Sequence, residues 1–213
     1  MKVIKILGTG EIADYGENNY LIVDGETAIL IDASANIEEI EKNLNMFNPR
    51  PCVKAILLTH AHFDHIFHLD ELISKYNCCV YTNAFGKDNL SSKENMSELL
   101  GYPLKIKDKK HIKIFKDGDE LKIDNVTVNC YLTPGHSRDS SVFRIENNLF
   151  VGDTVFKSAI GRTDLLGGNA QVLKISLLRI KEDLSHDIQT VFAGHGENFD
   201  KTTLSNVINY YIG

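Results

Sequence analysis

Tryptophan is absent from this sequence, and cysteine, proline and methionine are scarce, with four, four and three residues among 213. The cysteines are Cys52, Cys78, Cys79 and Cys130, and no two of them have the C-x-x-C spacing of many metal and redox sites. Cys78 and Cys79 are adjacent, which makes them poor disulfide partners for each other. The sequence therefore predicts buried or half-buried free thiols in a reducing compartment.

The sequence also lacks an excess of basic residues, and it has no long apolar run. The chain has 23 Lys and Arg against 29 Asp and Glu, a net charge of −6. Because phosphate binding needs a basic face, we expect no nucleic-acid partner. No segment approaches the roughly 20 apolar residues of a membrane-spanning helix, and the opening stretch 1–7 is too short and too interrupted by lysine for a signal peptide. We therefore expect a cytoplasmic protein without a membrane partner.

The length and the 43% hydrophobic content suit one domain with a sizeable core, spanning residues 1–213. Alternating apolar positions and turn residues predict strands at 3–7, 20–23, 28–31, 53–58, 79–81, 112–115, 120–123, 126–132, 141–145, 149–151 and 190–192. Helical spacing predicts helices at 36–47, 66–76, 170–184 and 202–211. This order predicts an α/β protein in which two mixed sheets pack face to face, with helices on the outer faces.

Metal-binding side chains are concentrated in one short segment. Thr59–His65 contains three histidines and an aspartate, and histidine is the commonest metal-binding side chain. A histidine-rich polar loop can arise without a function. Here, however, further His and Asp residues follow apolar runs downstream, at His136, Asp153 and His195. Because strand ends can converge at one edge of a sandwich, we expect these segments to form one metal site.

The number of donors predicts more than one metal ion. The seven are His60, His62, Asp64, His65, His136, Asp153 and His195. A catalytic zinc takes three protein ligands and keeps one position open, so seven donors suit two ions sharing a bridging carboxylate. The spacing predicts that His60 and His62 bind together, while Asp64 and His65 point elsewhere.

The motif His60-x-His62-x-Asp64-His65, followed in order by His136, Asp153 and His195, resembles that of the metallo-β-lactamase superfamily. The resemblance implies an αββα sandwich and two divalent metal ions, most often zinc, with iron or manganese as alternatives. It assigns His60, His62 and His136 to one ion, Asp64, His65 and His195 to the other, and Asp153 to both. It also implies that Asp64 and Asp153 act in catalysis with a metal-bridging hydroxide. Asp32 matches a buried acid behind the ligands.

Residues 152–164 resemble the hydroxyacylglutathione hydrolase (glyoxalase II) branch, in its short bacterial form. This resemblance implies hydrolysis of a small-molecule thioester. Arg162 aligns with a glutathione-binding lysine and is a candidate contact for a substrate carboxylate. An ion pair with Asp164 or Asp153 that orders the loop is an equally good interpretation of Arg162. Since the chain runs only a short way past His195, glutathione specificity does not follow from the resemblance.

Two alternatives belong to other functional classes. Persulfide dioxygenases share the His and Asp positions and the Gly-Arg-Thr-Asp run, here residues 161–164, but hold a single iron through two His and one Asp. A non-catalytic metal-binding module could also use the fold, although a degenerate site is expected to have lost at least one donor. A measurement of the metal content distinguishes these hypotheses, because the hydrolase would hold two metal ions per chain and the dioxygenase one iron.

Overall fold

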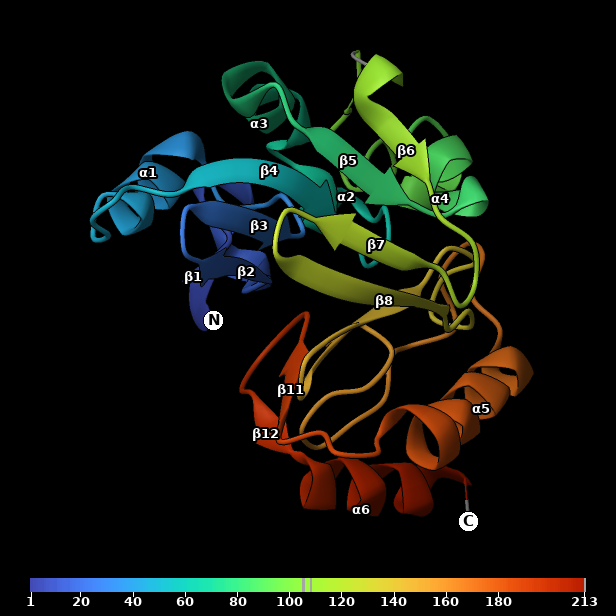
Figure 1. Cartoon of the computed structure of the whole chain (residues 1–213). Coiled ribbons are helices and arrows are strands. Elements are labelled where there is room, and N and C mark those ends of the chain that lie inside the picture. Colours follow the sequence, from blue (N-terminus) through green and yellow to red (C-terminus); the bar gives the residue numbers. More distant parts are fainter. Residues whose placement is uncertain (105, 108, 213) are drawn as a thin grey trace.

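The computed structural model describes residues 1–104, 106–107 and 109–212. Within them the chain forms two six-stranded sheets, which are stacked and carry helices on their outer sides (Figure 1). The predicted α/β sandwich of the metallo-β-lactamase type is confirmed. No helix in the described part of the chain has the length and apolarity to cross a membrane.

The first sheet contains the N-terminal strands in sequence order. They are β1 (Lys2–Leu7), β2 (Asn18–Asp24), β3 (Thr27–Ile31), β4 (Cys52–Leu57), β5 (Cys79–Thr82) and β6 (Ile112–Ile114). The pairs β1–β2 and β2–β3 are antiparallel, and β3 to β6 run parallel to one another. The sheet is therefore mixed, and β4 lies among its parallel strands.

The second sheet contains the C-terminal strands in reverse order. They are β12 (Phe199–Asp200), β11 (Thr190–Ala193), β10 (Asn148–Gly152), β9 (Ser141–Ile145), β8 (Val126–Leu132) and β7 (Glu120–Ile123). Only the β10–β11 pair is parallel among these ladders. This sheet is mixed too, and the parallel pair brings the carboxyl ends of β10 and β11 to the same edge.

Alternation along the strands divides the core into layers. On β2, Tyr20 and Ile22 face the second sheet, whereas Leu21 and Val23 face the helices outside the first sheet. The aromatic side chains Tyr20, Phe143 and Phe150 fill the space between the sheets. Burial on both faces explains why these strands read as nearly continuous apolar runs.

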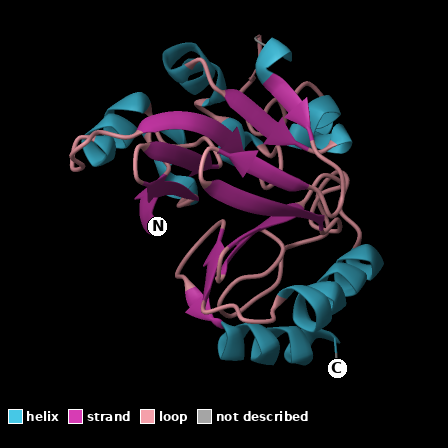
Figure 2. Cartoon of the chain, in the orientation of Figure 1, coloured by secondary structure: helices cyan, strands magenta, loops and turns pink. Residues whose placement is uncertain are grey.

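Helices cover both outer faces (Figure 2). They are α1 (Ile37–Leu44), α2 (Phe63–Ile66), α3 (Leu69–Tyr76), α4 (Ala84–Asn89), α5 (Ala170–Arg179) and α6 (Lys201–Ile212). Apolar residues of α1 and α3 pack on the first sheet, and those of α5 and α6 pack on the second. Short 3₁₀ turns occur at Gly10–Tyr15, Lys93–Asn95 and Lys109–His111, and a π turn, Ile180–Leu184, extends α5. Asn36 caps α1, as its side chain accepts a hydrogen bond from the Glu39 N–H.

The predicted continuous helix over 66–76 is wrong, because the chain breaks between α2 and α3. The His68 N–H donates to the Ala33 carbonyl at 2.8 Å, and the Ala33 N–H donates to the His65 carbonyl at 2.8 Å. These bonds to the segment after β3 replace helical ones.

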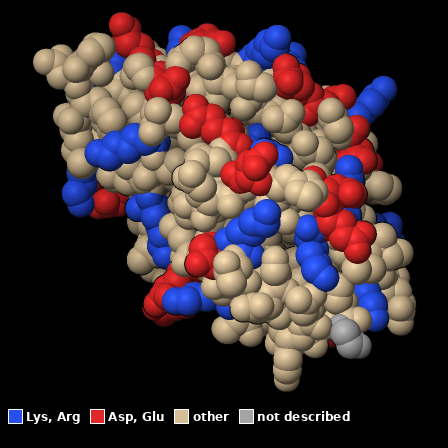
Figure 3. Space-filling model, turned by 60° about the horizontal axis from the view of Figure 1, so that its bottom comes forward, with Lys and Arg blue, Asp and Glu red and all other residues tan. Residues whose placement is uncertain are grey.

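Charged side chains are mixed on the face shown in Figure 3, where basic and acidic groups are interspersed. This distribution agrees with the small net charge of −6 in 213 residues. That face therefore has no large field of a single sign.

The cysteines are free thiols, as predicted, and Cys78 and Cys130 are buried. The prediction of burial is wrong for Cys52, which is exposed at the start of β4. Burial raises the pKa of Cys78 to about 11 and that of Cys130 to about 12. Since the thiolate is the reactive form, iodoacetamide at about pH 8 is expected to modify Cys52 well before either buried thiol. Peptide mass spectrometry over a time course measures this order. Equal rates at Cys52 and Cys130 would contradict it.

Candidate metal centre

Four chain segments meet at one edge of the sandwich, each of them following a strand. The segment after β4 carries residues 60–65, and those after β8, β10 and β11 carry His136, Asp153 and His195. Backbone hydrogen bonds join the loops: the Ser141 N–H donates to the Thr59 carbonyl at 2.8 Å, and the Gly194 N–H donates to the Gly152 carbonyl at 2.8 Å. Residues far apart in the sequence thus line a single site.

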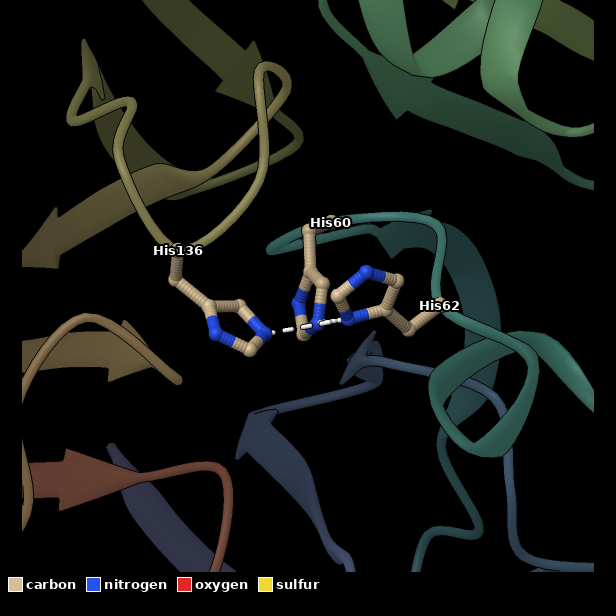
Figure 4. A group of neighbouring side chains, drawn as sticks. All are labelled: His60, His62 and His136. Carbon is tan, nitrogen blue, oxygen red and sulfur yellow. Dashed lines mark hydrogen bonds between the residues drawn. The ribbon is translucent and has the colours of Figure 1, made fainter. Parts of the chain in front are cut away.

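His60, His62 and His136 form the first donor cluster (Figure 4). His62 Nδ1 lies 3.0 Å from His60 Nε2 and 3.0 Å from His136 Nε2. His136 Nδ1 lies 2.8 Å from the Arg162 carbonyl oxygen, so Nδ1 is the donor and Nε2 keeps its lone pair. Burial, with the neighbouring imidazoles, lowers the pKa of His62 to about 3 and that of His60 well below its usual range. These two rings are therefore neutral near pH 7, as metal ligation requires.

Asp64, His65 and His195 form the second cluster, with donor atoms within 4.8 Å of one another. His195 Nε2 lies 3.5 Å from Asp64 Oδ2. The other ring nitrogen of His195 donates to the Tyr15 carbonyl at 3.0 Å, which leaves Nε2 facing the site. The His65 ring also lies beside that of His60, with centroids 4.0 Å apart, so the two clusters are adjacent.

Asp153 lies between the two clusters. Its Oδ2 is 3.7 Å from His136 Nε2 and 3.4 Å from His195 Nε2, and its Oδ1 is 3.4 Å from His65 Nε2. Burial alone would raise the pKa of Asp153, but the charges of His65 and His195 outweigh burial and hold the pKa well below its usual range. Asp153 is thus a buried carboxylate in contact with residues of both clusters.

Among the seven donor residues, three buried atoms make no hydrogen bond to the described residues: His62 Nε2, and His65 Nε2 and Asp153 Oδ1, which face each other at 3.4 Å. An unpaired buried polar group is costly, and its presence in a native site calls for an explanation. Imidazole nitrogens and carboxylate oxygens are donors that bind divalent metals. The donor chemistry and these atoms without partners fit a divalent metal site.

Asp32 lies directly behind His65. Its Oδ1 accepts from the Thr59 N–H at 2.8 Å, its Oδ2 accepts from the Thr59 hydroxyl at 2.8 Å, and the same Oδ2 lies 2.9 Å from His65 Nδ1. Asp32 has a positive φ of 63°. Asp32 therefore orients both the His65 ring and the start of the histidine-rich loop.

Replacing Asp32 by asparagine is expected to weaken metal affinity by roughly 10- to 100-fold, the range for loss of a partner behind a ligand. Asparagine also adopts positive φ, so the backbone is retained. Competition with a chromogenic chelator measures the affinity. Asp124→Asn is the matched control, since Asp124 also has a positive φ (51°) but is exposed and away from the site. Equal affinity in both variants would refute the orienting role of Asp32.

The sequence did not reveal two further buried acids. Glu17 is fully buried, and its Oε1 lies 3.5 Å from His65 Nδ1; burial raises its pKa well above the usual range, although His65 opposes the shift. Asp139 is also buried, and its Oδ2 accepts from the Ala61 N–H at 2.7 Å, which holds the loop between His60 and His62. Asp139 could have been suspected from its place three residues after His136, whereas no local pattern marks Glu17.

Arg162 lies at the rim of a cavity of about 460 Å³ that opens onto His62, His136 and His195. Its Nε and a terminal nitrogen donate to the two carboxylate oxygens of Asp164 at 2.7 and 2.8 Å. The ion pair considered as an alternative for Arg162 is therefore present. Contact between Arg162 and a substrate carboxylate stays a prediction.

The stacked mixed sheets and the His- and Asp-rich edge define an αββα protein with a site suited to divalent metals. The metallo-β-lactamase superfamily profile matches residues 13–195, and the chain belongs to this superfamily.

The chain is 34% identical to the probable metallo-hydrolase YqgX of Bacillus subtilis over 194 residues, 87% of this chain and 88% of that protein. It is 28% identical to the probable polyketide biosynthesis zinc-dependent hydrolase PksB of the same organism, over 90% of this chain and 77% of that protein. The crystal structure of the BLEG-1 B3 metallo-β-lactamase superposes with a TM-score of 0.84 at 28% identity, covering 100% of both chains.

Proposed function

We propose that this protein is a two-metal hydrolase that cleaves a small-molecule thioester. The observation that carries the proposal is the convergence of seven donor side chains into two clusters with Asp153 between them. Membership of a superfamily with relatives named as metallo-hydrolases supports metal-dependent hydrolysis. The thioester rests on the resemblance of residues 152–164 to the glyoxalase II branch.

The two clusters would hold one ion each. His60, His62 and His136 would bind the first ion, Asp64, His65 and His195 the second, and Asp153 both. Zinc suits a set of five imidazoles and two carboxylates, and the relative PksB is named as zinc-dependent. Iron and manganese also bind imidazole and carboxylate donors, so the native metal is a matter for measurement.

When bound, two divalent ions would lower the pKa of a coordinated water toward about 7 and polarise the substrate carbonyl. Asp64 and Asp153 would offset two of the four positive charges, which leaves the site attractive to a developing oxyanion. A thiolate leaves without being protonated, since a thiol pKa is about 8.5. The reaction therefore needs no separate general acid among the residues of the cavity.

Metal removal tests the proposal directly. Elemental mass spectrometry of the purified protein, grown without a biased metal supply, is expected to find about two divalent ions per chain. Thioester hydrolysis, followed with a thiol-reactive dye, is expected to disappear after dialysis against a chelator and to return when zinc is added. Turnover that persists in metal-free protein would refute the proposal.

A one-iron persulfide dioxygenase remains the alternative. His60, His65 and Asp153 also form a group of donors within 4.8 Å. Two imidazoles and one carboxylate are the donor set of many non-haem iron oxygenases. One iron per chain, with oxygen uptake on addition of a persulfide and no thioester hydrolysis, would favour this alternative.

Because the chain is similar to the BLEG-1 B3 metallo-β-lactamase, a β-lactam should be tested as a substrate in the same assays. Hydrolysis of a β-lactam at a higher kcat/KM than any thioester would overturn the thioester as the preferred substrate while leaving a metal-dependent hydrolase. Metal binding without turnover of a thioester, a β-lactam or a persulfide would favour a non-catalytic metal-binding module.

A further inference from the structure

The cavity over the metal site has a polar floor and largely apolar walls. His62, His136, Asp64, Asp153 and His195 form the polar part of its lining. The walls include the large apolar or aromatic side chains of Tyr15, Phe63, Met96, Leu100, Phe156 and Ile160. Its volume of about 460 Å³ lies in the range of small-molecule sites, about 300–1,000 Å³.

One wall is a packed aromatic group. The rings of Tyr15 and Phe63 meet edge to face with centroids 4.9 Å apart, and Phe63 stacks on Tyr102 at 5.3 Å with an interplanar angle of 10°. Phe63 directly precedes Asp64, and the Tyr15 carbonyl accepts from His195. The wall is therefore connected directly to the second donor cluster, through the chain at Phe63 and through the hydrogen bond to Tyr15.

The lysine and arginine side chains nearest the cavity are already paired with acids. Arg162 is the only Lys or Arg among the described lining residues, and both of its donating nitrogens bind Asp164. Lys157, which follows the wall residue Phe156, pairs with Glu197. A carboxylate on the substrate would have to displace an existing acid from either cation. A carboxylate at the far end of an acyl group, placed against the apolar wall and away from the metal site, would be buried without a partner, which is strongly unfavourable.

We propose that the cavity selects thioesters with an uncharged, apolar acyl group and discriminates against acyl groups that carry a carboxylate. The inference rests on the proposed thioester hydrolysis and assigns its substrate class. Contact of the acyl chain with the wall would remove apolar surface from water, and each methylene added would raise kcat/KM by about threefold to fourfold until the cavity is filled.

A series of acyl groups on one neutral thiol, N-acetylcysteamine, tests the selection. With metal-loaded protein, kcat/KM is expected to rise by about 80-fold to 250-fold from acetyl to hexanoyl, which differ by four methylenes, if the cavity takes the whole chain. The closest comparison is between the butanoyl and succinyl thioesters, because succinyl has a carboxylate where butanoyl has its terminal methyl group. The butanoyl thioester is expected to be better by at least about tenfold. A kcat/KM for succinyl equal to or above that for butanoyl would overturn the proposal.

Two neighbouring leucines provide matched variants. Leu100 lines the cavity and is 45% exposed, whereas Leu99 is 62% exposed and outside the lining. Leu100→Glu is expected to lower the hexanoyl-to-acetyl ratio of kcat/KM by at least about fivefold, because it places a charge in the wall. Leu99→Glu is expected to keep the wild-type ratio. An equal hexanoyl-to-acetyl ratio in both variants would contradict the proposed contact between the acyl chain and the wall.

A binding experiment distinguishes the hypothesis of thioester hydrolysis from the hypothesis that the cavity prefers apolar acyl groups. Methylene ketones, in which CH₂ replaces the thioester sulfur, cannot be hydrolysed and can be titrated calorimetrically into the metal-loaded protein. If no thioester is turned over but the hexanoyl ketone binds at least about tenfold more tightly than the succinyl ketone, the selection stands and thioester hydrolysis is wrong. If thioesters are turned over without a preference for apolar acyl groups, hydrolysis stands and the selection is wrong.

Discussion

Asp153→Asn is expected to lower kcat by about three orders of magnitude, because it removes the carboxylate that lies between the two donor clusters. Asparagine has nearly the same volume, so the buried space stays filled. Its amide lacks the negative charge that would offset two cations and offers one oxygen in place of two. The metal content is therefore expected to fall below that of the wild-type protein. Thioester hydrolysis and elemental mass spectrometry measure the two effects.

Circular dichroism separates this loss from unfolding, since the spectrum of Asp153→Asn is expected to match the wild type. Asp187→Asn is the matched control, as Asp187 is exposed and has a φ of 59° that asparagine adopts readily. The control is expected to keep both activity and metal. Near-normal turnover in the Asp153→Asn variant would refute the proposal of a two-metal hydrolase.

Gly194→Ala is expected to have the next largest effect, a loss of at least about 100-fold in kcat. A Cβ at residue 194 would lie 2.1 Å from Asp153 Oδ1 and 2.9 Å from Cε1 of His65. Neither group can move freely, because both are buried among the other donors. The carboxylate would have to shift by about 1 Å, and displacements of this size cost about 100-fold in rate. Kinetics and chelator competition on the same samples are the measurements.

Gly196 on the other side of His195 is the matched control. Gly196 has a φ of 75°, and a Cβ there would meet nothing within 4 Å. Gly196→Ala is therefore expected to cost about 1 kcal/mol of folding stability through backbone strain and to leave metal affinity unchanged. If both variants lose metal to the same degree, contact between the added Cβ and Asp153 is not the cause of the loss.

Local patterns predicted most of the strands closely. The strands at 126–132 and 141–145 agree with β8 and β9 at both ends, because alternation and turn residues act over a few neighbouring positions. The helix over 66–76 was predicted as continuous, and it breaks because Ala33 forms hydrogen bonds with the residues at the break. The short strand β12 at Phe199–Asp200 was missed, since its pairing with β11 leaves little local signal.

By itself the sequence determined which donors are available and in what order, since histidine and aspartate at these spacings carry metal-binding chemistry wherever they meet. It also determined the sheet–helix order, through periodicity. The family resemblance, rather than any local pattern, led to the expectation that Asp153 serves both clusters and that Asp32 lies behind the ligands. Only the tertiary structure decided that Glu17 stands behind His65 and that aromatic side chains from distant segments wall the cavity. These features depend on long-range packing of strand ends, and no local pattern of residues encodes such contacts.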